Sequence, residues 1–106
     1  MSDQQFSWPR RGGNDRARAQ IAAFLVIDIQ QSPDWARELL AKIADVKAGT
    51  LLSWERIGNA YRLYLSAAGG RIEDRIDSTS APEPFPLEEL EAAVTAWLQA
   101  IGPVGP

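Results

Sequence analysis

The sequence predicts an α+β domain, in which an antiparallel β-sheet of about five strands carries two packed α-helices in the order β-β-α-β-β-β-α. Three observations indicate this class. Apolar residues alternate at period two through residues 17–29, they recur at helical spacing in residues 33–48 and 87–101, and three short strand-like runs follow one another between residues 50 and 77. Because the strands come in runs rather than alternating with helices, the sheet is expected to be antiparallel.

The N-terminal part is expected to form a β-hairpin with a long second arm. Through residues 17–29 one face is apolar throughout, whereas the other begins with arginines and becomes apolar later. A strand that is apolar on both faces belongs in the middle of a sheet. Phe6 and Trp8 would lie on the first arm, which residues 11–15 connect to the second, and Pro9 would make that arm an edge strand.

A helix is expected to follow, beginning near Pro33 and ending at Gly49. Ser32 is a favourable N-cap, proline suits the first helical position, and glycine suits the left-handed residue that ends a helix. The apolar residues that would form its buried stripe are Trp35, Leu39, Ile43 and Val46.

A meander of three strands is expected next, joined by turns at residues 58–59 and 67–70. The expected strands cover residues 50–57, 60–66 and 71–77.

In the third of these strands the alternation places Ile72 and Ile76 inward. Glu73, Arg75 and Asp77 would then form an outer row of alternating charge, which suits an exposed sheet face or a protected edge. Asp74, between the two isoleucines, would either lie at the margin of the core or be paired.

The chain is expected to end on an amphipathic helix. Residues 78–86 contain three prolines and no periodicity, which is typical of an exposed connection. The helix would run over residues 87–101, with glutamates in its first turn and Gly102 after its end. Its apolar stripe would consist of Leu87, Leu90, Val94, Trp97, Leu98 and Ile101.

The length of 106 residues predicts a single domain over residues 1–106, with residues 1–5 and 102–106 flexible. No apolar run is long enough to span a membrane, and the first twenty residues do not have the basic-then-apolar order of a secretory signal. The absence of cysteine excludes a disulfide framework. These observations favour a cytoplasmic protein.

The composition argues against catalysis. There is no histidine and no cysteine, so the usual general acid–base, the commonest transition-metal ligand and the thiolate nucleophile are all missing. The glycine pairs at residues 12–13 and 69–70 lack the lysine and hydroxyl of a phosphate-binding loop. The acidic residues 73–77 would point in alternating directions along a strand and do not match a calcium loop. We therefore expect a binding protein without a metal or cofactor.

Charge and aromatic residues indicate which surface would bind. Residues 73–106 carry seven acidic side chains and a single arginine, which repels nucleic acid and attracts a basic partner. If the helices cover one sheet face, Tyr64, Arg56 and Arg62 would stand on the open one, and tyrosine and arginine are enriched at interface hot spots. The partner-binding residues expected are Glu73, Asp74, Asp77, Glu83, Arg62 and Tyr64.

The segment 53–63 and the elements that follow it form a pattern that is similar to known families. A tryptophan, a short gap, a glycine and an aromatic-x-leucine strand are followed by an acidic strand, and a closing helix of the 87–98 type comes after a proline-rich loop. Over roughly residues 50–101 this pattern resembles immunity proteins of contact-dependent and polymorphic toxin systems, and also an uncharacterised family of small bacterial proteins. The resemblance implies a cytoplasmic protein that neutralises a cognate toxin by binding it. It brings no catalytic residues.

Two other functions fit the sequence. One is a self-associating module, in which an exposed sheet edge or the open face pairs two copies into a symmetric homodimer. The other is a small-ligand module, which would need a roomy pocket between the helices and the sheet. A self-pairing face should be apolar and near neutral, whereas the third strand alternates in sign.

Overall fold

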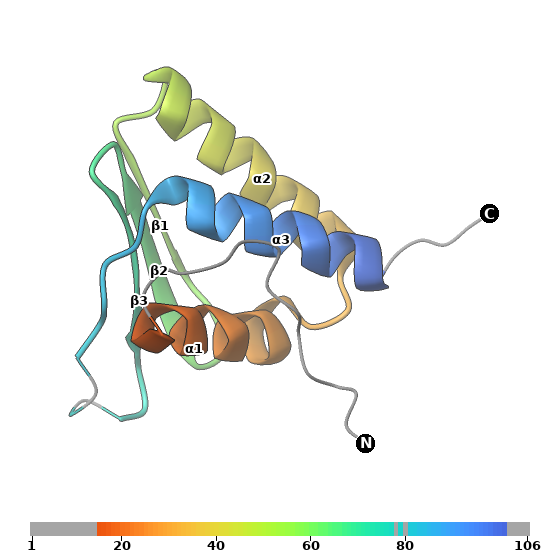
Figure 1. Ribbon diagram of the computed structural model, residues 1–106, viewed down its shortest axis with the longest axis vertical. Helices are drawn as coiled ribbons and strands as arrows, with labels where there is room; N and C mark the ends of the chain where they lie inside the picture. Colours follow the sequence, from red (N-terminus) through yellow and green to blue (C-terminus); the bar gives the residue numbers. More distant parts are fainter. Residues whose placement is uncertain (1–14, 78, 80, 102–106) are drawn as a thin grey trace.

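A computed structural model describes residues 15–77, 79 and 81–101. Three helices and a three-stranded antiparallel sheet make up this part of the chain, so the class α+β is confirmed, but the expected five strands and two helices are wrong. In Figure 1 all three helices lie on one side of the sheet. The expected first arm with Phe6, Trp8 and Pro9 and the tail 102–106 lie outside the described residues.

The expected long strand over residues 17–29 is helical. α1 covers Asp15–Phe24 and continues directly into a π-helical turn, η1, at Leu25–Ile29. Four of the ten residues of α1 are alanine, the residue with the highest helix propensity. Because alanines occur at both odd and even positions, the apolar residues fit an alternating pattern and a helical one equally well. In the structure the buried side chains recur at i, i+4 and i+7, as in a helix: Ala17, Ile21 and Phe24.

The second helix, α2, covers Pro33–Ala48 as expected. The hydroxyl oxygen of Ser32 accepts a hydrogen bond of 3.1 Å from the backbone N–H of Trp35, and Gly49 ends the helix in the left-handed conformation with φ of 85°. The third helix, α3, covers Leu87–Ile101, again as expected. Capping and helical periodicity therefore predicted both helices correctly.

The sheet has the order β1-β2-β3, with β1 at Ser53–Ile57, β2 at Tyr61–Ser66 and β3 at Gly69–Asp74. The third strand ends three residues earlier than expected, and Ile76 is exposed instead of buried. The cause is local. The carboxylate of Asp74 accepts hydrogen bonds of 2.9 Å from the backbone N–H groups of both Ile76 and Asp77, and this turn competes with the strand.

The core lies between the helices and the inner face of the sheet. Leu63 and Leu65 of β2 and Ile72 of β3 are fully buried against apolar side chains from all three helices. Those side chains are Ile21, Phe24, Leu25, Leu39, Ile43, Leu90 and Val94. Because the helices cover only this face, the opposite face of the sheet is left open (Figure 1).

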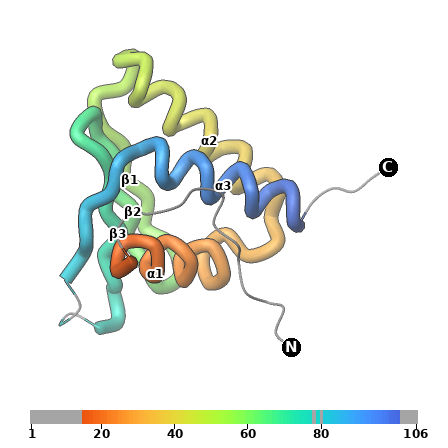
Figure 2. Tube along the Cα trace, viewed as in Figure 1, coloured from red at the N-terminus to blue at the C-terminus, as the bar shows by residue number. Residues whose placement is uncertain are grey.

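The segment 81–85 runs along the outer edge of β3, as the tube in Figure 2 shows. Gly70 and Phe85 exchange two backbone hydrogen bonds of 2.8 and 2.9 Å. The side chain of Gln20 in α1 holds the same segment by donating to the carbonyl of Ala81 and accepting from the N–H of Glu83, both at 2.9 Å. The β3 edge is thus covered, which protects it from pairing with other chains.

Asp28 ties the π-helical turn to the connection between β1 and β2. Its carboxylate is buried and accepts hydrogen bonds from the backbone N–H groups of Ala60 (3.0 Å) and Tyr61 (3.2 Å). A Cβ atom at Gly58 would lie 2.5 Å from the Oδ2 atom of Asp28, so only glycine allows this close approach. The buried carboxylate and the glycine therefore form one structural unit.

This unit predicts that Gly58→Ala destabilises the domain by about 1–3 kcal/mol, because the methyl group must displace the Asp28 carboxylate. Urea unfolding monitored by circular dichroism measures the change. In the Asp28→Ala background the same substitution should cost clearly less, since the clashing oxygen is gone. An equal loss of stability in the two backgrounds would contradict a direct contact between residue 58 and the Asp28 carboxylate.

Candidate functional site

The open face of the sheet is the surface on which most of the expected binding residues meet. Leu63 and Leu65 point inward, so the alternate residues of β2 and their register partners point outward. We define the open face by these outward residues: Glu55 and Ile57 of β1, Arg62 and Tyr64 of β2, and Arg71 and Glu73 of β3.

Arg62 is the centre of an ion-pair triad across the three strands. Its guanidinium donates a hydrogen bond to the carboxylate of Glu55, and another of its nitrogens lies 3.6 Å from a carboxylate oxygen of Glu73. Glu73 is the register partner of Arg62, so the two side chains lie directly opposite each other. All three groups are about half exposed and remain accessible to a partner.

Tyr64 lies beside this triad, flanked by Arg71. The guanidinium carbon of Arg71 is 4.3 Å from the centroid of the tyrosine ring, which is cation–π geometry. The two residues are register partners on neighbouring strands. The stacked guanidinium restricts the tyrosine ring, so less side-chain entropy is lost when a partner packs against it.

Two shallow hollows open on this face and share a wall formed by Arg62, Glu73 and Pro82. The smaller, of about 270 Å³, also touches Tyr64 and Arg71. The larger, of about 530 Å³, extends toward the end of β3 and is lined in addition by Ile57, Asp74, Arg75, Thr79 and Ala81. Arg75, Thr79, Ala81 and Pro82, which follow β3, therefore border one side of the open face.

The structure brings together four of the six expected binding residues. Arg62, Tyr64 and Glu73 stand on the open face, and Asp74 lines the larger hollow. The other two lie elsewhere. Glu83 pairs with Arg16 of α1 at 3.4 Å, and Asp77 accepts hydrogen bonds from the N–H and the hydroxyl of Thr79, which lower the pKa of its carboxyl below the usual range.

Arg56 is not on the open face, contrary to the expectation. Its register partner is the buried Leu63, and its guanidinium carbon lies 3.8 Å from the ring centroid of Trp35 on the helix side of the sheet. It also pairs with Glu38 at 3.7 Å. Because β1 is the outer strand, an inward-facing arginine there can extend past the core and keep its charge at the surface.

The expectation that the tryptophan of α2 is a core residue is only partly right. Trp35 is half-buried and packs edge-to-face between Phe24 and Trp54, with centroid distances of 6.4 and 6.2 Å. With Arg56 on top, this stack covers the helix side of β1.

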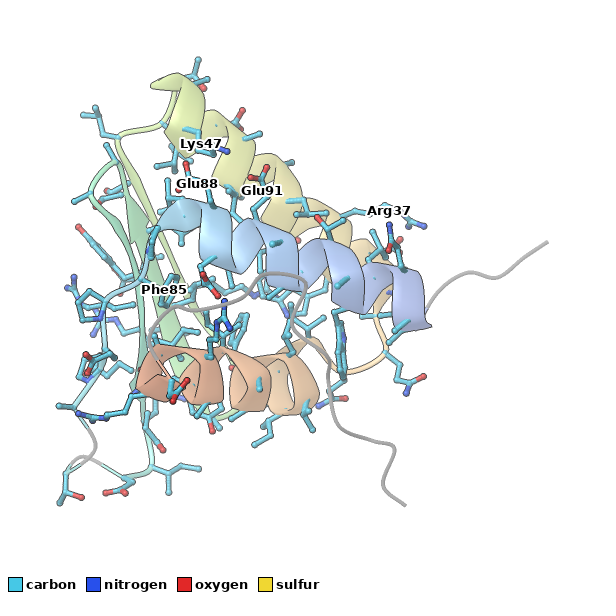
Figure 3. All side chains as sticks on the ribbon, in the orientation of Figure 1. Arg37, Lys47, Phe85, Glu88 and Glu91 are labelled. Carbon is cyan, nitrogen blue, oxygen red and sulfur yellow. The ribbon has the colours of Figure 1, made fainter. Side chains whose placement is uncertain are left out.

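A third hollow, of about 270 Å³, lies between the end of α2, the β2–β3 turn and the start of α3. Figure 3 shows Lys47 of α2 beside Glu88 and Glu91 of α3. The ammonium group lies 2.8 Å from Glu91 and 3.9 Å from Glu88. The hydrogen bond to Glu91 raises the pKa of Lys47. With its charge already matched by these carboxylates, the lysine does not make this hollow a site for anions.

Tyr61 faces the opposite side of β2 from Tyr64. Burial raises the pKa of its hydroxyl, and the carboxylates of Asp74 and Asp28 raise it further. Tyr61 is the register partner of Asp74, and its backbone N–H binds Asp28. Tyr61 thus lies beside the structural unit formed by Asp28 and Gly58.

Within residues 15–77, 79 and 81–101, no three acidic side chains gather in a way that could hold a metal ion. None of the helices in that part of the chain is long and apolar enough to cross a membrane. Comparison with protein-family models, curated proteins and solved structures gives no match.

Proposed function

We propose that this protein is a non-catalytic domain that binds a protein partner through the open face, and that the partner is a basic bacterial toxin which the domain neutralises in the cytoplasm. The observation that carries the proposal is the open face itself. It combines a restrained tyrosine, two accessible arginines and two carboxylates around shallow hollows.

Tyrosine and arginine are enriched among the residues that dominate binding energy at protein interfaces. On the open face Arg71 restrains Tyr64, and the two carboxylates orient Arg62. Groups that are already ordered lose less conformational entropy on binding. Hollows this shallow suit side chains projecting from a protein surface better than a small ligand, which pockets usually enclose on most sides.

The toxin partner is supported by charge and by the resemblance of residues 50–101 to bacterial immunity proteins. The chain has a net charge of −3, and nuclease toxins, which bind polyanions, are commonly basic. The charges of the open face alternate in sign. The overall field would therefore steer a basic partner toward the domain, and the alternating charges would select the orientation in which it docks.

Capture from the native host with the tagged protein as bait tests the proposal. We expect one basic protein to be recovered, in smaller amount at raised salt. Tyr64→Ala should reduce the recovery about tenfold or more, which corresponds to the loss of a hot-spot side chain. Leu52→Ala, a matched truncation of an exposed side chain off the open face, should not change it.

Growth then distinguishes a toxin from another partner. Expression of the captured protein alone should stop growth, and co-expression of the wild-type domain should restore it, whereas the Tyr64→Ala variant should restore it less. If the captured protein is harmless but its capture depends on Tyr64, the domain binds a protein partner and the proposal that this partner is a toxin is wrong. Equal recovery by wild type and Tyr64→Ala would contradict the open face as the binding surface.

A further inference from the structure

Four exposed aliphatic residues lie on chain segments that meet at or near the connection between β1 and β2. The exposed fractions are 56% for Val26, 40% for Ile27, 58% for Ile57 and 79% for Ile76. Among the described residues, these are four of the five large hydrophobic side chains that are exposed; the other is Leu52, at the opposite end of β1. We call these four residues the aliphatic end. Isolated exposed aliphatic residues are common, but a group around one turn marks an interaction site.

Hydrogen bonds hold the segments of the aliphatic end to the same turn. Ile27 precedes Asp28, whose carboxylate binds the N–H groups of Ala60 and Tyr61. Ile76 follows Arg75, whose backbone N–H donates to the carbonyl of Ala60 at 2.8 Å and whose guanidinium donates to the carbonyl of Gly58 at 3.3 Å. Ile27 and Ile76 thus lie on segments that are hydrogen-bonded to the same turn, and Ile57 directly precedes Gly58 of that turn.

The charges beside Ile76 favour a second copy of this chain as the occupant. Arg75 precedes the isoleucine and Asp77 follows it, and both side chains are exposed. A two-fold axis through Ile76 would place this isoleucine against its own copy, with each Arg75 opposite the other protomer's Asp77. The order of charges along this segment is therefore complementary to itself, as an isologous contact requires.

The free edge of β1 does not offer the same match. Antiparallel pairing of β1 with its own copy places residues of the same face opposite each other, so a two-fold axis near the middle of the strand sets Glu55 against Glu55 or Arg56 against Arg56. Like charges directly opposite are destabilising, and Arg56 is an inward-pointing charge of the kind that protects an edge strand.

From these observations we infer that the aliphatic end is a homodimer interface, in which two copies pack Val26, Ile27, Ile57 and Ile76 around a two-fold axis and pair Arg75 with Asp77 across it. Ile57 and Arg75 also line the larger hollow, so a dimer would cover part of the open face. Self-association and partner binding would then compete.

Sedimentation equilibrium of the purified full chain tests the interface without any partner, so its outcome is separate from that of the proposed function. The apparent mass of the wild type should rise with concentration from the monomer mass of 11.7 kDa toward twice that mass. Ile76→Glu and Val26→Glu should each raise the dissociation constant about tenfold or more. Leu52→Glu, the same change at an exposed site outside the interface, should leave it unchanged.

Charge exchange tests the two-fold arrangement. Asp77→Arg alone places like charges across the axis and should weaken the dimer, whereas Arg75→Asp combined with Asp77→Arg should restore it. Circular dichroism spectra identical to the wild type show that each variant is folded. A wild type that remains monomeric at millimolar concentration would overturn the inference. So would a dimer that dissociates with Leu52→Glu but not with Ile76→Glu, or one that the double exchange does not restore.

Discussion

Replacing Asp28 with alanine is expected to lower the free energy of unfolding by about 2–4 kcal/mol, the largest effect of any single carboxylate outside an ion pair. The substitution leaves the backbone N–H groups of Ala60 and Tyr61 without their acceptor in a largely buried site. It also removes the group that holds the π-helical turn to the sheet. Urea unfolding followed by circular dichroism measures the loss.

Two further variants show that the loss belongs to this carboxylate. Asp28→Asn keeps one oxygen acceptor but turns an NH₂ group toward a backbone N–H, so it should cost less than alanine and still be measurable. Asp45→Ala removes an exposed helical carboxylate and should change stability by no more than about 0.5 kcal/mol. If Asp28→Ala is no more costly than Asp45→Ala, the assigned structural contribution of Asp28 is wrong.

Glu89→Ala is expected to lower the free energy of unfolding by about 3–5 kcal/mol, because it breaks a buried ion pair. The carboxylate of Glu89 in α3 lies 2.6 Å from the Nε atom of Arg18 in α1, and the two side chains are only 9% and 12% exposed. Removing the carboxylate leaves the charge of Arg18 in a poorly hydrated site between two helices. The shift in the urea midpoint, at unchanged slope, measures the effect.

The pair offers a sharp control. Exchanging both residues for leucine removes both buried charges and should recover most of the stability, as replacing a whole buried ion pair by apolar residues commonly does. Glu91→Ala breaks the exposed contact with Lys47, which has similar geometry, and should shift the midpoint far less. A double variant as unstable as Glu89→Ala would show that the loss does not come from breaking this ion pair.

The sequence predicted the elements whose ends have specific chemistry. Ser32 and Gly49 delimit α2, and the glutamate-rich first turn marks the start of α3. The prediction of a strand at residues 17–29 was wrong because alanine is apolar enough to extend an alternating pattern and is also a favourable helix residue. The predicted end of β3 was wrong because the hydrogen bonds of one side chain, Asp74, outweigh strand propensity. A pattern of apolar residues does not reveal such hydrogen bonds.

The candidate site was predicted in part for similar reasons. Alternation along β2 gave Arg62 and Tyr64 their common face, and alternation along the third strand placed Glu73 outward. Charge alone could not show that Glu83 turns toward α1, because this depends on the path of residues 81–85. Arg56 was assigned to the wrong face because exposed edge strands let an arginine point inward and still reach water.

The ion pairs also change how the acidic C-terminal third acts. Read as a sequence, residues 73–106 form an acidic block, but in the fold many of these carboxylates contact basic side chains of other segments. Glu73 binds Arg62, Glu89 binds Arg18, and Glu91 binds Lys47. The open face therefore presents alternating charges instead of a uniformly negative patch, and specificity for one partner would come from the order of these charges.

Calorimetric titration of the captured partner into a charge-reversed variant tests the open face most directly. The variant Glu55→Arg, Arg62→Glu, Glu73→Arg reverses the triad yet keeps each ion pair, so the fold should be retained. It raises the net charge by two, as does the control Asp45→Lys on α2. We predict that binding weakens at least about a hundredfold for the reversed triad and little for the control. Equal affinity of the reversed triad and the control would contradict binding through the open face.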